Sequence, residues 1–243
     1  MSFFMKDARV IEGGNRENAY KRRNMNKKRF AVVLAGCGVY DGAEIHEAVL
    51  AMLAIMKQGG SYQCFAPDIL QSDVVNHFDG SEMHEKRNVL VESARIARGE
   101  IKRLSEFNVA DYDALIFPGG FGAAKNLSTV AHDGAEAKVT PEVERSIRDM
   151  VAAKKPIGAL CIAPAFVAKV LEGVEVTIGN DAGTIAAIEA MGSRHKVTTH
   201  GEVVVDTKFN VFTTPCYMLD ANLLDIEQGA NHVVEEIMKS FKD

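Results

Sequence analysis

The sequence predicts an α/β protein built on a mostly parallel β-sheet that helices cover on both faces. From residue 27 onward, short β-branched runs alternate with longer segments of helical period, the pattern of a parallel sheet with crossover helices. The run at 114–117 is apolar throughout, as in strands buried on both faces. A chain of 243 residues that is 47% hydrophobic fits one large domain of this kind.

The individual elements follow from these periodicities and from their turn residues. Glycine-rich segments are expected to turn the chain sharply after the first strand and after residues 114–117. Residues 206–210 are expected to close a hairpin near the end of the chain. The expected strands are 29–35, 61–66, 101–103, 114–117, 156–160, 174–178, 202–205 and 211–214, and the expected helices are 43–58, 88–98, 141–153, 164–171, 182–191 and 221–241.

Composition excludes several classes of function. The formal charge is -5, and acidic and basic residues are interspersed. The sequence therefore has no basic stripe that could bind the phosphates of a nucleic acid, and we expect no nucleic-acid partner. Charged residues and proline break every apolar run before it could span a membrane. Four cysteines without a secretory signal make no disulfide framework, and they predict a reducing, cytoplasmic location. No cysteine, histidine or carboxylate spacing typical of metal ligands occurs, so we expect no metal.

Residues 1–24 are set apart from the domain, which we expect to span residues 25–243. The first segment is polar, rich in glycine and asparagine, and precedes a second methionine. It is interpreted as a disordered leader or tag. A mitochondrial presequence is the alternative, and Asp7, Glu12 and Glu17 weigh against it because such presequences are poor in acidic residues.

Cys161 is the strongest candidate for chemistry. It lies between a buried strand and a helix, where unpaired backbone amides are expected to lower the thiol pKa. Because ligands bind at the carboxyl ends of parallel strands, the glycines at 36–42 and 119–122 should share its crevice. Gly119 and Gly120 could then present amides to an oxyanion. The alternative is that Cys161 is simply a small buried residue.

Three segments carry a resemblance to a known family. They are 36–47 (GCGVYDGAEIHE), 117–126 (FPGGFGAAKN) and 161–165 (CIAPA). Together they resemble the ElbB group, named for enhancing lycopene biosynthesis and for isoprenoid-biosynthesis glyoxalase activity, within the PfpI-like superfamily. The resemblance covers residues 25–243. It implies a flavodoxin-like three-layer sandwich of the class I glutamine amidotransferase-like type and a homodimer.

The resemblance also implies an activity and a set of site residues. The activity is that of a glutathione-independent glyoxalase without a cofactor, which converts small glyoxal-like dicarbonyls to hydroxy acids, and the resemblance offers deglycase activity as a further expectation. Cys161 matches the nucleophile, and Glu44 matches a protonated acid hydrogen-bonded to its sulfur. Gly119, Gly120 and the amide of Ile162 match the oxyanion site.

One departure from the superfamily pattern concerns histidine. The superfamily's histidine follows the cysteine by about one helix and one strand, where this chain has residues 179–181 (GND). Asp181 or His195 is left as a candidate proton shuttle. Two other hypotheses therefore stay open: a non-catalytic, redox-sensing cysteine protein of the same fold, and a hydrolase or protease.

Overall fold

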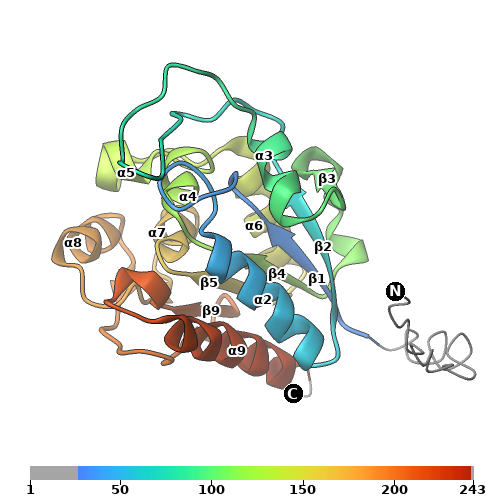
Figure 1. Cartoon of the computed structure of the whole chain (residues 1–243). Coiled ribbons are helices and arrows are strands. Elements are labelled where there is room, and N and C mark those ends of the chain that lie inside the picture. The colour runs from blue at the N-terminus through green and yellow to red at the C-terminus, as the bar shows by residue number, and fades with distance from the viewer. Residues whose placement is uncertain (1–26, 242–243) are drawn as a thin grey trace, which may run out of the picture.

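A computed structural model describes residues 27–241, and its centre is a seven-stranded sheet (Figure 1). The strand order is β3-β2-β1-β4-β5-β9-β8, and every pairing is parallel except that of β8 with β9. In chain order the strands are β1 (Arg29–Val33), β2 (Ser61–Ala66), β3 (Ile101–Arg103), β4 (Ala114–Phe117), β5 (Ile157–Leu160), β8 (Val204–Asp206) and β9 (Val211–Thr214). The three strands whose ends we expected to share a crevice, β1, β4 and β5, are neighbours.

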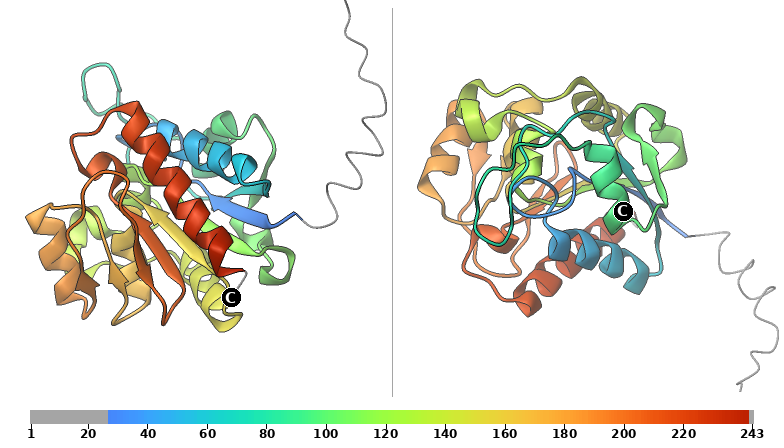
Figure 2. Two further views of the ribbon diagram at one scale, coloured as in Figure 1. Left: turned by 90° about the horizontal axis from the view of Figure 1, so that it is seen from below. Right: turned by 45° about the horizontal axis from the view of Figure 1, so that its top comes forward.

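Helices form a layer on each face of the sheet (Figure 2). One layer holds α2 (Ile45–Lys57), α3 (Val89–Ile96) and α9 (Leu223–Ser240), and α2 lies alongside α9. The other layer holds α6 (Pro141–Ala152) and α7 (Ala163–Val170). The shorter helices are α4 (Phe121–Lys125), α5 (Val130–Asp133) and α8 (Ala182–Ala190), and single 3₁₀ turns occur at Leu104–Glu106, Val109–Asp111, Gly134–Glu136 and Cys216–Met218.

The fold class predicted from the sequence is therefore confirmed: the protein is a three-layer, flavodoxin-like α/β sandwich. The predicted hairpin at its edge is also present, because β8 and β9 pair in antiparallel fashion. The strand expected at 174–178 is shorter than predicted and lies outside the main sheet. Only β6 (Glu175–Val176) forms there, and it pairs with β7 (Arg194–His195) in a separate two-stranded sheet.

The face that α2 turns to the core differs from the prediction. The helical period of residues 43–58 predicts a core face of Ile45, Val49, Met52 and Ile55 or Met56. Met52 and Ile55 are buried, whereas Ile45 and Val49 are exposed. The other residues of the buried face are Glu47, Ala48, Ala51 and Ala54. The small alanine side chains allow α2 to approach both the sheet and α9 closely.

The core follows the central strands. Every residue of β4 and β5 is buried, and the rings of Phe117 and Phe166 meet edge to face across the sheet-helix boundary, with centroids 5.1 Å apart. The predicted leader, residues 1–24, lies outside the described residues. Within residues 27–241, no helix is long and apolar enough to cross a bilayer.

Candidate active site

Cys161 occupies a sharp turn between β5 and α7. Its φ of 60° is a left-handed conformation that ordinary residues rarely adopt, at a cost of about 1–3 kcal/mol. A 3.0 Å hydrogen bond from its amide to the carbonyl of Thr214 on β9 holds the turn. The predicted elbow is therefore present, and Cys161, only 7% exposed, lines a cavity at the end of the sheet.

Two backbone amides point at the Cys161 sulfur. They belong to Gly120 and Ile162, and both favour a negative charge on that atom. The positive φ of Gly120, 92°, turns its amide toward the site. These two residues occupy the positions expected of oxyanion donors.

Gly119 does not supply the third amide that the sequence predicted. Its N–H donates to Glu47 Oε2 at 2.9 Å, and its carbonyl accepts from the amide of Glu44 at 3.0 Å. Gly119 is needed here because a Cβ would lie 2.4 Å from Cys161 Cβ. The residue therefore permits the close approach of the acid to the cysteine.

Glu47 is the carboxyl group that contacts the sulfur. Its side chain hydrogen-bonds to Cys161, and its two oxygens also accept the amides of Gly119 and, at 3.3 Å, Tyr217. Glu47 has no exposed surface. Burial, with a smaller contribution from nearby Glu44, raises its pKa from 4.5 to about 8. Glu47 is thus protonated in most molecules at neutral pH, and it shares a hydrogen bond with the Cys161 thiol.

This assignment corrects the prediction for Glu44, which the resemblance placed against the sulfur. Glu44 is the N-cap of α2, and its Oε2 accepts the amide of Glu47 at 2.7 Å. The residue has an extended backbone, so its side chain leaves the helix in a different direction from that of Glu47. Glu44 is 8% exposed and lines the cavity beside Cys161.

A second correction concerns the thiol pKa. The helix N-terminus was expected to lower it, but burial and the adjacent Glu47 raise the pKa of Cys161 well above its ordinary value. The amides of Gly120 and Ile162 act in the opposite direction and are outweighed. Because the two groups share one hydrogen bond, they lose their protons as a pair.

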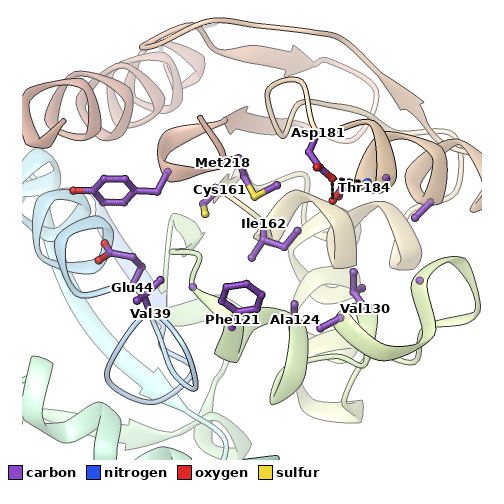
Figure 3. Close-up of a pocket in the computed structure, with 16 residues that line it drawn as sticks. Val39, Glu44, Phe121, Ala124, Val130, Cys161, Ile162, Asp181, Thr184 and Met218 are labelled. Atoms are coloured by element: carbon purple, nitrogen blue, oxygen red, sulfur yellow. Dashed lines mark hydrogen bonds between the residues drawn. The ribbon is translucent and has the colours of Figure 1, made fainter. Parts of the chain in front are cut away.

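The cavity above the sulfur has a volume of about 560 Å³. Figure 3 shows Cys161 between Glu44 and Ile162, with Phe121, Ala124 and Val130 along one wall. The lining residues are Val39, Glu44, Gly120, Phe121, Ala124, Val130, Ala131, Gly134, Cys161, Ile162, Asp181, Gly183, Thr184, Ala187, Tyr217 and Met218. The nucleophile candidate and one carboxylate therefore open onto the same space.

The two candidate proton shuttles lie in different places. Asp181 lines the cavity, but it caps α8 and accepts both the amide and the hydroxyl of Thr184, which lower its pKa. It is a poor proton donor for that reason. His195 is not a lining residue, and its Nε2 accepts the amide of Ile178 at 3.1 Å. Burial lowers its pKa, and the structure does not bring it to Cys161.

A histidine that the sequence analysis did not single out lies at the edge of the site. His46 Nδ1 is 2.9 Å from the hydroxyl of Tyr217 and 3.9 Å from Glu44 Oε1. Tyr217 lines the cavity with Glu44.

One signal in the sequence could have identified Glu47. It shares a helical face with Ala48, Ala51 and Ile55, a core position that a carboxyl group rarely takes.

No cluster of three or more histidine, cysteine, aspartate or glutamate side chains that could bind a metal occurs in the described part of the chain. The four cysteines are free thiols.

Solved structures share this architecture. An isoprenoid biosynthesis protein with an amidotransferase-like domain from Ehrlichia chaffeensis is 38% identical, with a TM-score of 0.83 over 88% of this chain and 99% of that chain. Glyoxalase III from Candida albicans, at 14% identity, has the same fold, with a TM-score of 0.58 over 88% of this chain and 97% of that one. The protein is thus of the class I glutamine amidotransferase-like type.

Curated relatives identify the family within this class. The ES1 protein homolog of Rattus norvegicus is 48% identical over 88% of this chain and 84% of its own. A human relative, glutamine amidotransferase-like class 1 domain-containing protein 3, is 49% identical over 87% and 82%. The chain belongs to this ES1 family. No family model matches the sequence.

These relatives correct the predicted location. The rat and human proteins, and the ES1 protein of Danio rerio, 34% identical over 89% of this chain and 87% of its own, are all named as mitochondrial. The cytoplasmic prediction was wrong, and the relatives point to mitochondria. The absence of a disulfide framework, on which that prediction rested, does not distinguish two reducing compartments.

Proposed function

We propose that this protein is a glutathione-independent, glyoxalase-type enzyme that converts glyoxal-like dicarbonyls to hydroxy acids, and that it is related in activity to the ElbB group. The observation that carries the proposal is the surroundings of one sulfur. Cys161 contacts the amides of Gly120 and Ile162 and a protonated Glu47, and it opens onto a cavity. This is the arrangement that addition of a thiolate to a carbonyl requires.

In the first step, the Cys161 sulfur forms a bond to the aldehyde carbon. The carbonyl oxygen takes up the thiol proton and becomes a hydroxyl group, which gives a hemithioacetal. The amides of Gly120 and Ile162 stabilise the negative charge that develops on this oxygen. The pKa of Cys161 is raised well above its ordinary value, so most of the sulfur is a thiol at pH 7 and its proton is the one that the oxygen takes up.

In the second step, a base moves a proton between the two carbons. The carboxylate of Glu44 lines the cavity beside the sulfur and takes this role in our proposal. It removes the proton from the first carbon and returns it to the second, while the hydroxyl proton passes to the second oxygen. The product is a thioester of a hydroxy acid. Water then releases the acid and regenerates the thiol, so no oxidant, reductant or cofactor is consumed.

Glu44 would thereby replace the superfamily's histidine, in whose place this chain has residues 179–181 (GND). The two glutamates on the first turn of α2 have different surroundings, since Glu47 is fully buried against the sulfur and Glu44 faces the cavity. Asp181 is less suitable because one oxygen accepts both the amide and the hydroxyl of Thr184, and His195 is less suitable because it does not line the cavity.

The test is to incubate the purified protein with glyoxal or methylglyoxal, without glutathione, and to measure the hydroxy acid formed. We expect Cys161→Ala to reduce formation to background and Glu44→Gln to reduce it by about a hundredfold or more. Cys37→Ala is the matched control, because Cys37 does not line the cavity. Equal rates for wild type and Cys161→Ala would refute the proposal.

The redox-sensor hypothesis predicts a different result from the same protein. A peroxide sensor and an enzyme that adds to carbonyls both use the Cys161 thiolate, so turnover is what separates the two hypotheses. Rapid formation of the sulfinate at Cys161, without turnover of any dicarbonyl, would favour the sensor.

A further inference from the structure

The cavity is larger than the smallest dicarbonyls require. Its volume of about 560 Å³ lies within the range of roughly 300–1,000 Å³ that drug-sized ligands occupy. Glyoxal and methylglyoxal, attached to Cys161, would leave most of this space to water. The site therefore has room for a substituent on the carbonyl compound.

Most of the wall away from the sulfur is apolar. Phe121, Ala124 and Val130 line one side, and Ile162 separates them from the opposite side (Figure 3). Val39 and Met218 complete this apolar surface. An apolar substituent placed here leaves water, and each buried methylene strengthens binding roughly fourfold.

The charges in the cavity have one sign. Glu44 and Asp181 are the acidic lining residues, and no lysine, arginine or histidine lines the cavity among residues 27–241. Asp181 has its carboxylate form stabilised by the amide and hydroxyl of Thr184. The amides of Gly120 and Ile162 are directed at the sulfur and the reacting oxygen, so they cannot also pair with an anionic group at the other end of a substrate.

His46 offsets this charge only at the rim. Its ring is more than half exposed, and its Nδ1 lies 3.9 Å from Glu44 Oε1. The same nitrogen hydrogen-bonds to the hydroxyl of Tyr217. An anionic group at the outer part of the cavity, near the exposed Asp181, would meet a like charge, and no cationic side chain among residues 27–241 lines the cavity there.

We propose that the cavity selects uncharged 2-oxoaldehydes that carry an apolar substituent, and that it discriminates against phosphorylated and carboxylated carbonyl compounds. This inference rests on the proposed function for the reaction itself. The selection by charge is a property of the cavity alone and can be measured without turnover.

The charge selection is tested with a matched pair of alkylating agents. Iodoacetamide is neutral and iodoacetate is an anion of similar size, and each replaces its iodide with the Cys161 sulfur. The alkylation rate at Cys161 is measured by peptide mass spectrometry at one pH and divided by the rate with free cysteine. We expect iodoacetate to be disfavoured by at least about tenfold after this correction.

Two variants separate the cavity from the rest of the surface. Asp181→Asn keeps a good N-cap for α8 and should raise the relative iodoacetate rate several-fold. Asp111→Asn removes an exposed carboxylate that precedes β4, at the opposite end of the sheet from Cys161, and should change nothing. Equal corrected rates for the two reagents, or equal effects of the two variants, would overturn the charge selection.

The substituent is tested by turnover of methylglyoxal, phenylglyoxal and para-carboxyphenylglyoxal. We expect kcat/KM for phenylglyoxal to exceed that for methylglyoxal by about tenfold or more, and the carboxylate to remove this gain. A preference for methylglyoxal would refute the inference while leaving the glyoxalase proposal intact. Turnover of none of the three would refute the proposed function, and the alkylation rates would still decide the charge selection.

Discussion

Replacing Glu47 with glutamine tests the most unusual feature of the site, a protonated acid in the core. Glutamine has nearly the same shape as the neutral acid but cannot ionise. In the wild type, burial raises the pKa of Glu47 from 4.5 to about 8. Unfolding exposes this group to water, where it releases its proton above about pH 4.5.

The sign of the effect follows from the direction of the pKa shift. Because the folded state holds the proton more tightly, the stabilisation from Glu47 is fully present below pH 4.5 and is lost as the pH rises through 8. Between pH 5 and pH 7.5 the loss amounts to about 3 kcal/mol, at 1.36 kcal/mol for each pKa unit. Glu47→Gln removes this pH dependence and adds a constant cost of about 1–3 kcal/mol, since its amide nitrogen must face a backbone N–H.

The assay is urea unfolding of both proteins, followed by circular dichroism at pH 5 and pH 7.5. The difference in unfolding free energy between wild type and Glu47→Gln should change by about 3 kcal/mol between these conditions, with the variant gaining relative stability at the higher pH. A difference that stays constant within about 1 kcal/mol would show that Glu47 is not held protonated, and the reasoning about the pair would be refuted.

Two further predictions concern the thiol and the loops around it. The rate of Cys161 alkylation by iodoacetamide should rise steeply with pH and continue to rise at pH 9, because the pKa of the thiol is raised well above its ordinary value of 9.0; a rate that levels off below about pH 8 would contradict this. Asn126→Ala should destabilise the protein by about 2–4 kcal/mol in urea unfolding, since the buried amide group bonds the carbonyls of Ala35 and Asp41 and the amide of Ser72. The exposed Asn108→Ala is its control and should cost no more than about 1 kcal/mol; equal losses in the two variants would contradict the role of Asn126.

Much of the fold was predictable because its signals are local. The apolar strand at 114–117 and the short strand at 101–103 lie where the sequence placed them. The glycines after β4 predicted a sharp bend, and Gly120 indeed has a positive φ. Very short strands are harder to predict. β6 and β7 have only two residues each, and each is a strand only because it pairs with the other.

The site was only partly predictable. Sequence position alone placed Cys161 between strand and helix and Gly120 after the neighbouring strand, and the family resemblance added the amide of Ile162. It could not tell which of two glutamates three residues apart reaches the sulfur. That choice depends on the rotation of α2, and the exposed Ile45 and Val49 show that hydrophobicity does not set this rotation.

The sequence by itself determined the alternation of strands and helices, the neighbouring strand ends and the cysteine at the elbow, because each follows from periodicity, glycine conformation or topology. Only the tertiary structure decided that Glu47 is the buried acid, that Glu44 faces the cavity, and that the thiol pKa is raised. The physical reason is that these properties depend on burial and on distances between side chains from separate elements. Close packing of small residues on α2 against the sheet and α9 fixes those distances.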